Sequence, residues 1–165
     1  MLPMAPIDRI AIRMREIGEA VDYTTLAGID APVTVRHSRK RHPVRSDRPC
    51  HTIIFVGDEA VPGETGVNAW EIERRAVFDI QSDIDVPSDD ETGLVALGRF
   101  SAAFIRALRQ EGSAMLELVN WVAEGDIEPE DRAQPEDGRL TRSLDVLYRV
   151  RSDDGNVLLT AEENA

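Results

Sequence analysis

The sequence is poor in cysteine and lysine: Cys50 is its one cysteine and Lys40 its one lysine. A single cysteine excludes an internal disulfide and leaves no second thiol for a redox pair or a zinc knuckle. The N-terminal residues lead directly into an amphipathic segment, and no stretch reaches the roughly 18 apolar residues of a membrane span. We therefore expect neither a secretion signal nor a transmembrane helix. The 165 residues, 42% of them hydrophobic, suit one globular domain over 1–165.

Catalytic motifs are also missing. The sequence contains no HExxH pair, no Walker loop and no GxGxxG fingerprint, and its few serines adjoin turns. His37, His42 and His51 fall close to Cys50, which raises a zinc site as a hypothesis. Their spacing matches no zinc pattern, and an adjacent cysteine and histidine point to opposite faces of a strand. We expect no enzyme, no metal site and no cofactor.

Acidic residues clearly outnumber basic residues in this chain. Asp and Glu number 31 against 19 Arg and Lys, which gives a net charge of -12. Self-repulsion at this level is costly in dilute buffer, whereas molar salt shortens the screening length to about 3 Å and removes most of that cost. An acidic chain with almost no lysine is typical of proteins from salt-loving organisms, halophilic archaea in particular. An acidic, arginine-rich product of a GC-rich genome is the alternative.

One segment reverses this charge. Residues 36–48 contain one acid, Asp47, and carry a net charge of +5, so the remainder of the chain carries -17. We interpret the segment as a contact for a neighbouring subunit or another acidic protein surface, or for nucleic acid without sequence specificity. A solvated loop that neutralises its own acidic subunit is the plain alternative. The candidate contact residues here are its six basic side chains, Arg36, Arg39, Lys40, Arg41, Arg45 and Arg48.

The longest regular pattern lies between residues 68 and 84. Its even positions are apolar, with Arg74 as the one charged exception, and this period of two predicts a strand with one buried face. An unbroken strand of this length reaches roughly 50 Å, more than the core of such a domain needs. We therefore expect it to overhang its sheet, and we add Trp70 and Arg74 to the candidate contact residues. The apolar positions are Trp70, Ile72, Ala76, Phe78, Ile80 and Ile84.

The other elements follow from their own periodicities. Apolar residues spaced by three and four predict helices at 7–22 and 89–110. Pro6 helps to start the first, Ser88 and Glu91 have capping-box spacing at the start of the second, and residues 23–30 predict a turn. The run Thr52–Val56 predicts a strand buried on both faces, which pairs with the long strand to give a β-hairpin over 52–84. The remaining expectations are a short strand at 33–35, C-terminal strands over about 117–160 and a solvated acidic loop at 124–138. The C-terminal strands come from the apolar run 116–123, the alternation at 143–151 and a terminal hairpin after 151.

These elements predict an α+β fold: a mainly antiparallel β-sheet with a long β-hairpin and two helices packed on one face. An N-terminal helix, an overlong hairpin, a capped second helix and a closing strand of the type SLDVLYRVRSDDGNVLL succeed one another. In this arrangement the chain resembles the tail terminator proteins of long-tailed (siphovirus-type) viruses. It departs from them by its extra length, in the basic segment and in the acidic loop at 124–138.

The resemblance implies a structural virion protein without chemistry of its own. Members of that family form a hexameric ring that caps the tail tube and joins it to the neck of the head, so the implied partners are further copies, the tail tube protein and neck or head-completion proteins. The implied location is the tail-neck junction of a virion assembled in the host cytoplasm, with no membrane contact. Two alternatives stay open: another neck component, such as a tail completion or head-closure protein, and a nucleic-acid-binding module that uses the basic segment.

Overall fold

The computed structural model describes residues 4–37, 47–61, 71–85, 90–110, 119, 121–124, 133–134, 138–151 and 155. Within this part the chain forms three helices and six strands, an α+β fold as the sequence predicts. None of the described helices is long and apolar enough to cross a membrane. In chain order the elements are α1 (Pro6–Glu19), α2 (Tyr23–Ala27), β1 (Thr34–His37), β2 (Cys50–Ala60), β3 (Glu71–Asp83), α3 (Asp90–Gln110), β4 (Trp121–Glu124), β5 (Ala133–Gln134) and β6 (Arg139–Arg151).

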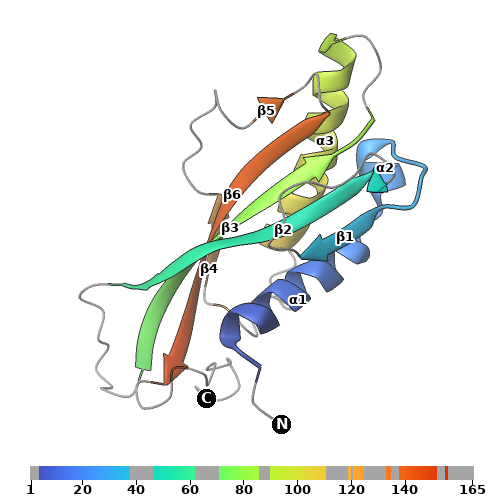
Figure 1. Ribbon diagram of the computed structural model, residues 1–165. Coiled ribbons are helices and arrows are strands. Elements are labelled where there is room, and N and C mark those ends of the chain that lie inside the picture. The colour runs from blue at the N-terminus through green and yellow to red at the C-terminus, as the bar shows by residue number, and fades with distance from the viewer. Residues whose placement is uncertain are drawn as a thin grey trace.

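The described strands form one sheet in the order β1-β2-β3-β6-β4, with β5 paired to β6 (Figure 1). All pairs are antiparallel except β1 and β2, which run parallel from Thr34 opposite Cys50 to His37 opposite Ile53. Parallel neighbours need a crossover of about a dozen residues, because the chain must return to the same end of the sheet. The basic segment supplies that connection, which gives it a topological role that its charge did not reveal.

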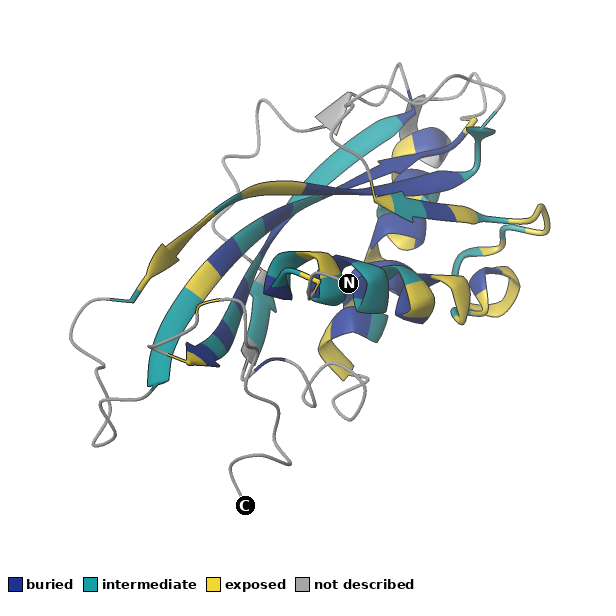
Figure 2. Cartoon of the chain, turned by 60° about the horizontal axis from the view of Figure 1, so that its bottom comes forward, coloured by how far each residue is buried: buried dark blue, intermediate teal, exposed yellow. Residues whose placement is uncertain are grey.

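The helices cover one face of the sheet, which we call the helix face (Figure 2). Helix α1 contacts β1 and β2, and α3 contacts β3, β6 and β4. The core between them is made by the apolar stripes of both helices and the inward positions of the central strands. Its fully buried large side chains are Ile10, Met14, Ile53, Phe78, Ile80, Leu97, Phe100, Phe104, Leu108, Leu144 and Tyr148.

Both predicted helices exist, but the first is shorter than the sequence suggested. Pro6 lies in the first turn of α1, as expected, and the helix ends at Glu19. The segment interpreted as a turn contains the short helix α2, whose amino end is capped by Asp22 through the backbone N–H of Thr25. Gly28 ends α2 in the left-handed conformation at φ 70°, which L side chains adopt at a cost. This extra turn carries Tyr23 into the core.

The interpretation of Thr52–Val56 as a strand buried on both faces is wrong beyond Ile54. Phe55 is 44% exposed and Val56 52% exposed. Strand β1 is described only to His37, opposite Ile53, so no described strand lies beside β2 from Ile54 onward. A β-bulge between Phe55 and Gly57 also inserts Val56 as an extra residue opposite β3.

The long predicted strand is present as β3, over 71–83, and so reaches about 43 Å at the usual rise per residue. Ala76, Phe78 and Ile80 are fully buried, which confirms the period of two. From residue 81 the alternation stops, because Gln81, Ser82 and Asp83 are buried one after another. The second face of the sheet is therefore covered at this end, although the sequence predicted a polar, solvated face.

The far ends of the three central strands form an arm that extends beyond the helices (Figures 1 and 2). We define the arm as residues 54–60 of β2, 71–79 of β3 and 143–151 of β6. These stretches are in continuous register, with Ala60 opposite Arg74 and Arg74 opposite Tyr148. The predicted overhang is thus three strands wide, because residues 143–151 of β6 pair with 71–79 of β3. At the opposite end β6 begins at Arg139, four residues earlier than the sequence indicated, and so runs along all of β3.

Several expectations about the second half of the chain fall on residues or side chains that the structure does not describe. These are the capping box, of which Ser88 and the side chain of Glu91 are not described, most of the acidic loop at 124–138 and the terminal hairpin after 151. The predicted strand at 116–123 is described from Trp121 and continues to Glu124, where it pairs with β6.

A glycine at the start of β6 gives the first testable prediction. Gly138 has φ 66°, its carbonyl accepts the N–H of Ile84 at 2.9 Å, and an added Cβ would lie 2.0 Å from the Ile84 carbonyl oxygen. Gly138→Ala is therefore expected to reduce the free energy of unfolding by about 3 kcal/mol, part from the left-handed backbone and part from the displaced Ile84 strand. Gly28→Ala is the matched control, because Gly28 shares the conformation but has open space around it. It should cost roughly 1–2 kcal/mol in the same thermal melts, and equal losses in both variants would contradict the steric argument.

Candidate functional site

Three of the eight residues predicted to contact a partner are in the described structure. They are Arg36 in β1, Arg48 just before β2 and Arg74 in β3. Arg39, Lys40, Arg41, Arg45 and Trp70 lie outside the described residues. The structure therefore locates both ends of the basic segment and one position on the arm, and it does not bring these three arginines into one cluster.

Arg36 lies on the second face of the sheet. Its Nη1 is 3.1 Å from Oδ2 of Asp47, and its Nε donates to Oγ1 of Thr52 at 3.4 Å. Both charged side chains are about one third exposed, at 33% and 32%. The single acid of the basic segment thus neutralises one of its own arginines, and a partly exposed pair of this kind contributes little to stability.

Arg48 is directed into its own subunit, with 8% of its side chain exposed. Its guanidinium lies 3.7 Å from Oδ1 of Asp83 and donates to the carbonyl oxygen of Ile84 at 3.2 Å. Asp83 is itself fully buried, and its carboxylate also accepts from Nε of Arg139 at 2.8 Å and from Nε2 of Gln81 at 2.8 Å. Two guanidinium groups and an amide thus surround one buried carboxylate, which joins the crossover, β3 and β6 at their covered end.

Arg74 belongs to a cluster on the helix face of the arm. Its Nε donates to Oδ2 of Asp58 at 2.6 Å, and the hydroxyl of Tyr148 donates to the same oxygen at 2.7 Å. Partial burial acts to raise the pKa of Asp58, but the hydrogen bonds from Arg74 and Tyr148 outweigh it and hold that pKa below its usual value. Arg74, the one charged residue among the apolar positions of the long strand, is therefore paired within the arm. The cluster has one residue from each of the three strands.

The second face of the arm carries alternating charges. Arg75 in β3 contacts Asp145 in β6 and lies 3.9 Å from Glu59 in β2. One step further along, Arg149 lies 3.5 Å from Glu71 and 3.6 Å from Glu73. In these cross-strand pairs the arginine side chains are 41–45% exposed, whereas Asp145, Glu71 and Glu73 are 12–25% exposed. Each pair alone contributes little because solvent screens the arginine, but together the pairs favour the observed register of the three strands.

His51 is the most unusual side chain that the sequence did not single out on its own. It is fully buried on the helix face, where its ring stacks on Phe100 at a centroid distance of 4.0 Å and lies 5.3 Å from the ring of Tyr23. Its Nδ1 is 2.9 Å from the hydroxyl of Ser82, while Nε2 has no hydrogen-bond partner among the described residues. Burial lowers the pKa of His51 to about 3, so the ring is neutral at ordinary pH.

Cys50 lies on the other face of the same strand, as the alternation predicts. Its side chain is fully buried, and burial together with the charge of Asp83 raises the pKa of the thiol to about 11. The thiol is thus protonated at neutral pH and is a poor nucleophile. Among the described residues no group of three metal-ligating side chains comes together.

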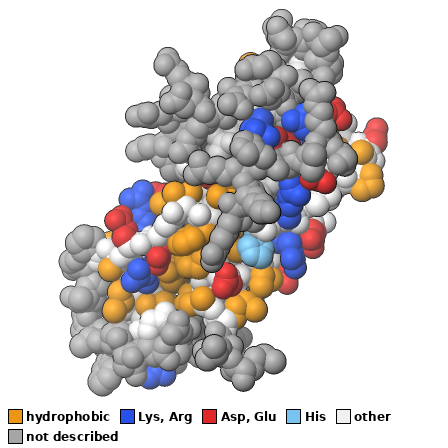
Figure 3. Space-filling view, in the orientation of Figure 1, with side chains coloured by type: hydrophobic (Ala, Val, Ile, Leu, Met, Phe, Trp, Pro, Cys, Tyr) orange, Lys and Arg blue, Asp and Glu red, His pale blue; other side chains and the backbone are white. Residues whose placement is uncertain are grey.

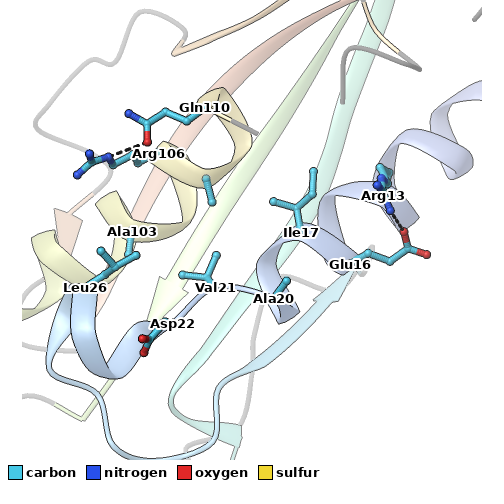
Figure 4. A pocket seen from close by; sticks show the side chains of 11 residues that line it. Arg13, Glu16, Ile17, Ala20, Val21, Asp22, Leu26, Ala103, Arg106 and Gln110 are labelled. Carbon is cyan, nitrogen blue, oxygen red and sulfur yellow. Dashed lines mark hydrogen bonds and ion pairs between the residues drawn. The ribbon is translucent and has the colours of Figure 1, made fainter. Parts of the chain in front are cut away.

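A groove of about 470 Å³ lies between α1, α2 and α3 (Figure 4). Ile17, Val21 and Leu26 line it with apolar surface. Its charged side chains are engaged locally, since Arg13 pairs with Glu16 at 2.6 Å and Nε of Arg106 donates to Gln110 at 2.9 Å. The groove therefore offers an apolar depression between helices but no nucleophile with an adjacent base.

The most exposed apolar side chains of the sheet lie at the base of the arm. In the space-filling view hydrophobic side chains gather over β2 and α1, with charged residues scattered between them (Figure 3). Phe55 and Val56 are both exposed in β2, and Phe55 borders a second groove of about 380 Å³ with Ile7, Ala11 and Phe78. Exposed apolar surface of this kind is typical of a protein contact.

No protein-family model matches this chain, and no curated protein matches its sequence. The geometry alone therefore has to carry any statement about function. The described side chains form contacts that hold strands together, in the buried Asp83 cluster and across the arm, rather than a reactive constellation. In the sequence, the sign of the buried Asp83 cluster is Asp83 itself. It is a carboxylate near the end of the predicted long strand, and part of that strand has to lie inside the domain.

Proposed function

We propose that this chain is a structural subunit of a long-tailed virus and acts as a tail terminator. In this proposal several copies close into a ring that caps the tail tube, with the tail tube protein on one side and neck or head-completion proteins on the other. The acidic, lysine-poor composition further suggests a virus of a halophilic archaeon. The protein would act through ring closure and surface complementarity and would catalyse no reaction.

The arm is the observation that carries this proposal. It extends beyond the helices, and its β2 edge exposes apolar side chains that the subunit itself does not bury. Phe55 and Val56 stay about half exposed in the single subunit, so a neighbour that covers them would bury apolar surface. The order of elements on which the family resemblance depends is also present, since a helix precedes the long hairpin and a second helix and the closing strand follow it.

The basic segment contributes less to a nucleic-acid surface than its charge suggests. Arg36 is paired with Asp47, and Arg48 is buried against Asp83. A contact of these two arginines with phosphate would have to break their pairs, and the remaining -17 of the chain repels nucleic acid unless salt screens it. The ring proposal is therefore favoured over the binding module.

Ring formation is tested by multi-angle light scattering of the full chain in molar salt. Six copies of 18.3 kDa give a particle of roughly 110 kDa, which should appear as a closed ring with sixfold symmetry by negative-stain electron microscopy. Dilution into about 0.1 M salt should dissociate or unfold it, because the screening length grows from about 3 to 10 Å and the acidic subunits repel one another. Monomers at every concentration in molar salt would contradict the proposal, and a closed ring of another copy number would favour a different neck component.

A further inference from the structure

The groove of about 380 Å³ at the base of the arm, which we call the arm groove, combines apolar surface with one acid. Ile7, Ile53 and Phe55 belong to its apolar lining, and Asp8 and His37 are its polar side chains. Asp8 is exposed in the first turn of α1, and its carboxylate forms no ion pair among the described residues. An acid without a charge partner beside an apolar groove suits a partner that has both apolar surface and a positive charge.

A surface of this matching character lies near the start of α3. Leu94 is 48% exposed and Val95 50% exposed, although both belong to a helix that covers the sheet. Arg99 follows Val95 by four residues, so the two side chains lie on the same side of the helix. Arg99 is exposed and, like Asp8, has no ion-pair partner in the part of the chain that the structure describes. The start of α3 thus presents two apolar side chains followed by a positive charge.

The two surfaces lie at opposite ends of the helix layer. Helices α1 and α3 approach each other through their second halves, which line the groove shown in Figure 4. Figure 1 shows α3 beginning at the top of the view and α1 beginning near the bottom. One subunit therefore cannot place the start of its own α3 in its own arm groove. A contact between these two different surfaces has to form between copies, and such head-to-tail contacts close into a ring when the rotation between copies allows it.

We propose that the start of α3 in one copy docks in the arm groove of the next copy. Leu94 and Val95 then enter the groove, and Arg99 lies beside Asp8. This inference rests on the proposed function and specifies the contact by which its ring closes. Docking buries the apolar surface of Leu94, Val95 and Phe55, each about half exposed in the single subunit.

The charges also favour this occupant over a twofold contact. Two arm grooves that face each other would oppose Asp8 to Asp8, and two α3 starts would oppose Arg99 to Arg99. Only the head-to-tail contact brings the acid of one copy to the arginine of the next.

The test is cross-linking between cysteines on the two surfaces, in the full chain and in molar salt. Ala5→Cys places a thiol in the arm groove, Val95→Cys places one on the docking helix, and both changes leave the charged pair in place. A bismaleimide joins such thiols without the strict geometry of a disulfide. We expect a ladder of linked oligomers up to the hexamer, roughly tenfold stronger than in the control Ala31→Cys with Val95→Cys, because Ala31 is exposed but lies outside the groove. The native Cys50 is fully buried and should not react.

Charge reversal tests the ion pair, at the lowest salt concentration in which the wild-type protein assembles. Arg99→Asp alone should raise the dissociation constant of the assembly about tenfold, because two carboxylates then face each other. Adding Asp8→Arg restores the attraction in the opposite sense and should return the constant to about the wild-type value. A double variant that assembles no better than Arg99→Asp would overturn the proposed pairing.

The cross-linking outcomes separate this contact from the ring itself. A ring of roughly 110 kDa without these cross-links overturns the docking and leaves the ring proposal standing. Strong dimers from either single-cysteine variant also overturn it, because they would mean that one surface pairs with itself. Cross-linked ladders in a protein that light scattering finds in an open or non-hexameric assembly support the docking and contradict the hexamer. Monomers without cross-links contradict both.

Discussion

Replacing Asp83 with asparagine is expected to lower the free energy of unfolding by about 3–5 kcal/mol. Asp83 is fully buried, and its carboxylate is the shared partner of Arg48, which is 8% exposed, and Arg139, which is 17% exposed. Asparagine keeps nearly the same volume but removes the negative charge, so two poorly hydrated guanidinium groups lose their counter-charge. For a domain of this size the change should lower the melting temperature by roughly 10 °C.

Asp85→Asn is the matched control for this prediction. Asp85 lies 3.6 Å from the same arginine but its side chain is 78% exposed. Its removal should change the free energy of unfolding by less than about 0.5 kcal/mol, because water and salt already screen that pair. Both variants are compared by thermal and denaturant unfolding in molar salt. Similar melting temperatures for the two variants would show that the buried cluster does not hold the crossover to β3 and β6.

Acid is expected to destabilise the protein through His51. Burial lowers the pKa of this histidine from 6.5 to about 3, so the folded state keeps the ring neutral while the unfolded chain takes up a proton below pH 6.5. The stability that the neutral ring supplies is thus complete above pH 6.5 and is lost as the pH falls toward 3. The loss is about 1.4 kcal/mol per pH unit, which amounts to about 2 kcal/mol at pH 5 and about 5 kcal/mol near pH 3.

His51→Phe isolates this contribution, since phenylalanine retains the stack on Phe100 but cannot take up a proton. Unfolding free energies measured from pH 7.5 to 5 should fall less steeply for the variant, by about 1.4 kcal/mol per pH unit below pH 6.5. His37→Gln is the control, because His37 is exposed at the end of β1 and should leave the wild-type slope unchanged. The window stays above pH 5 because most of the carboxylates protonate below it. Parallel slopes for His51→Phe and wild type would mean that the imidazole is hydrated in the folded protein.

Much of the fold could be predicted because local periodicity reports which face of an element is buried. The spacing of Ile10, Met14 and Ile17 gave helix α1, and the alternation of Ala76, Phe78 and Ile80 gave the central strand β3. The boundaries were less certain: α1 ends three residues early, and α2 occupies what the pattern indicated as a turn. Short helices of this kind have too few residues for a periodicity to develop.

The candidate site could be predicted only in outline. The charge contrast of the basic segment is a property of composition, and the overhang of the long strand follows from its length. Which arginines remain available depends on partners elsewhere in the chain. Arg48 meets Asp83 and the Ile84 carbonyl, which is 36 residues away in sequence, and Tyr148 meets Asp58 across 90 residues. No local pattern reports such pairings.

The sequence by itself determined the two kinds of element, their order along the chain, the long hairpin and the inward face of each main helix and strand. Only the tertiary structure decided that β1 lies parallel to β2, that Phe55 and Val56 are exposed, and that Asp83 and His51 are enclosed on opposite faces of the sheet. The physical reason is that the periodicity of a segment records that one of its faces is buried, but not which other segment covers that face. Strand order, register and the covering of the second face depend instead on contacts between segments far apart in the chain, and these contacts determine which edges and charges the subunit presents to a partner.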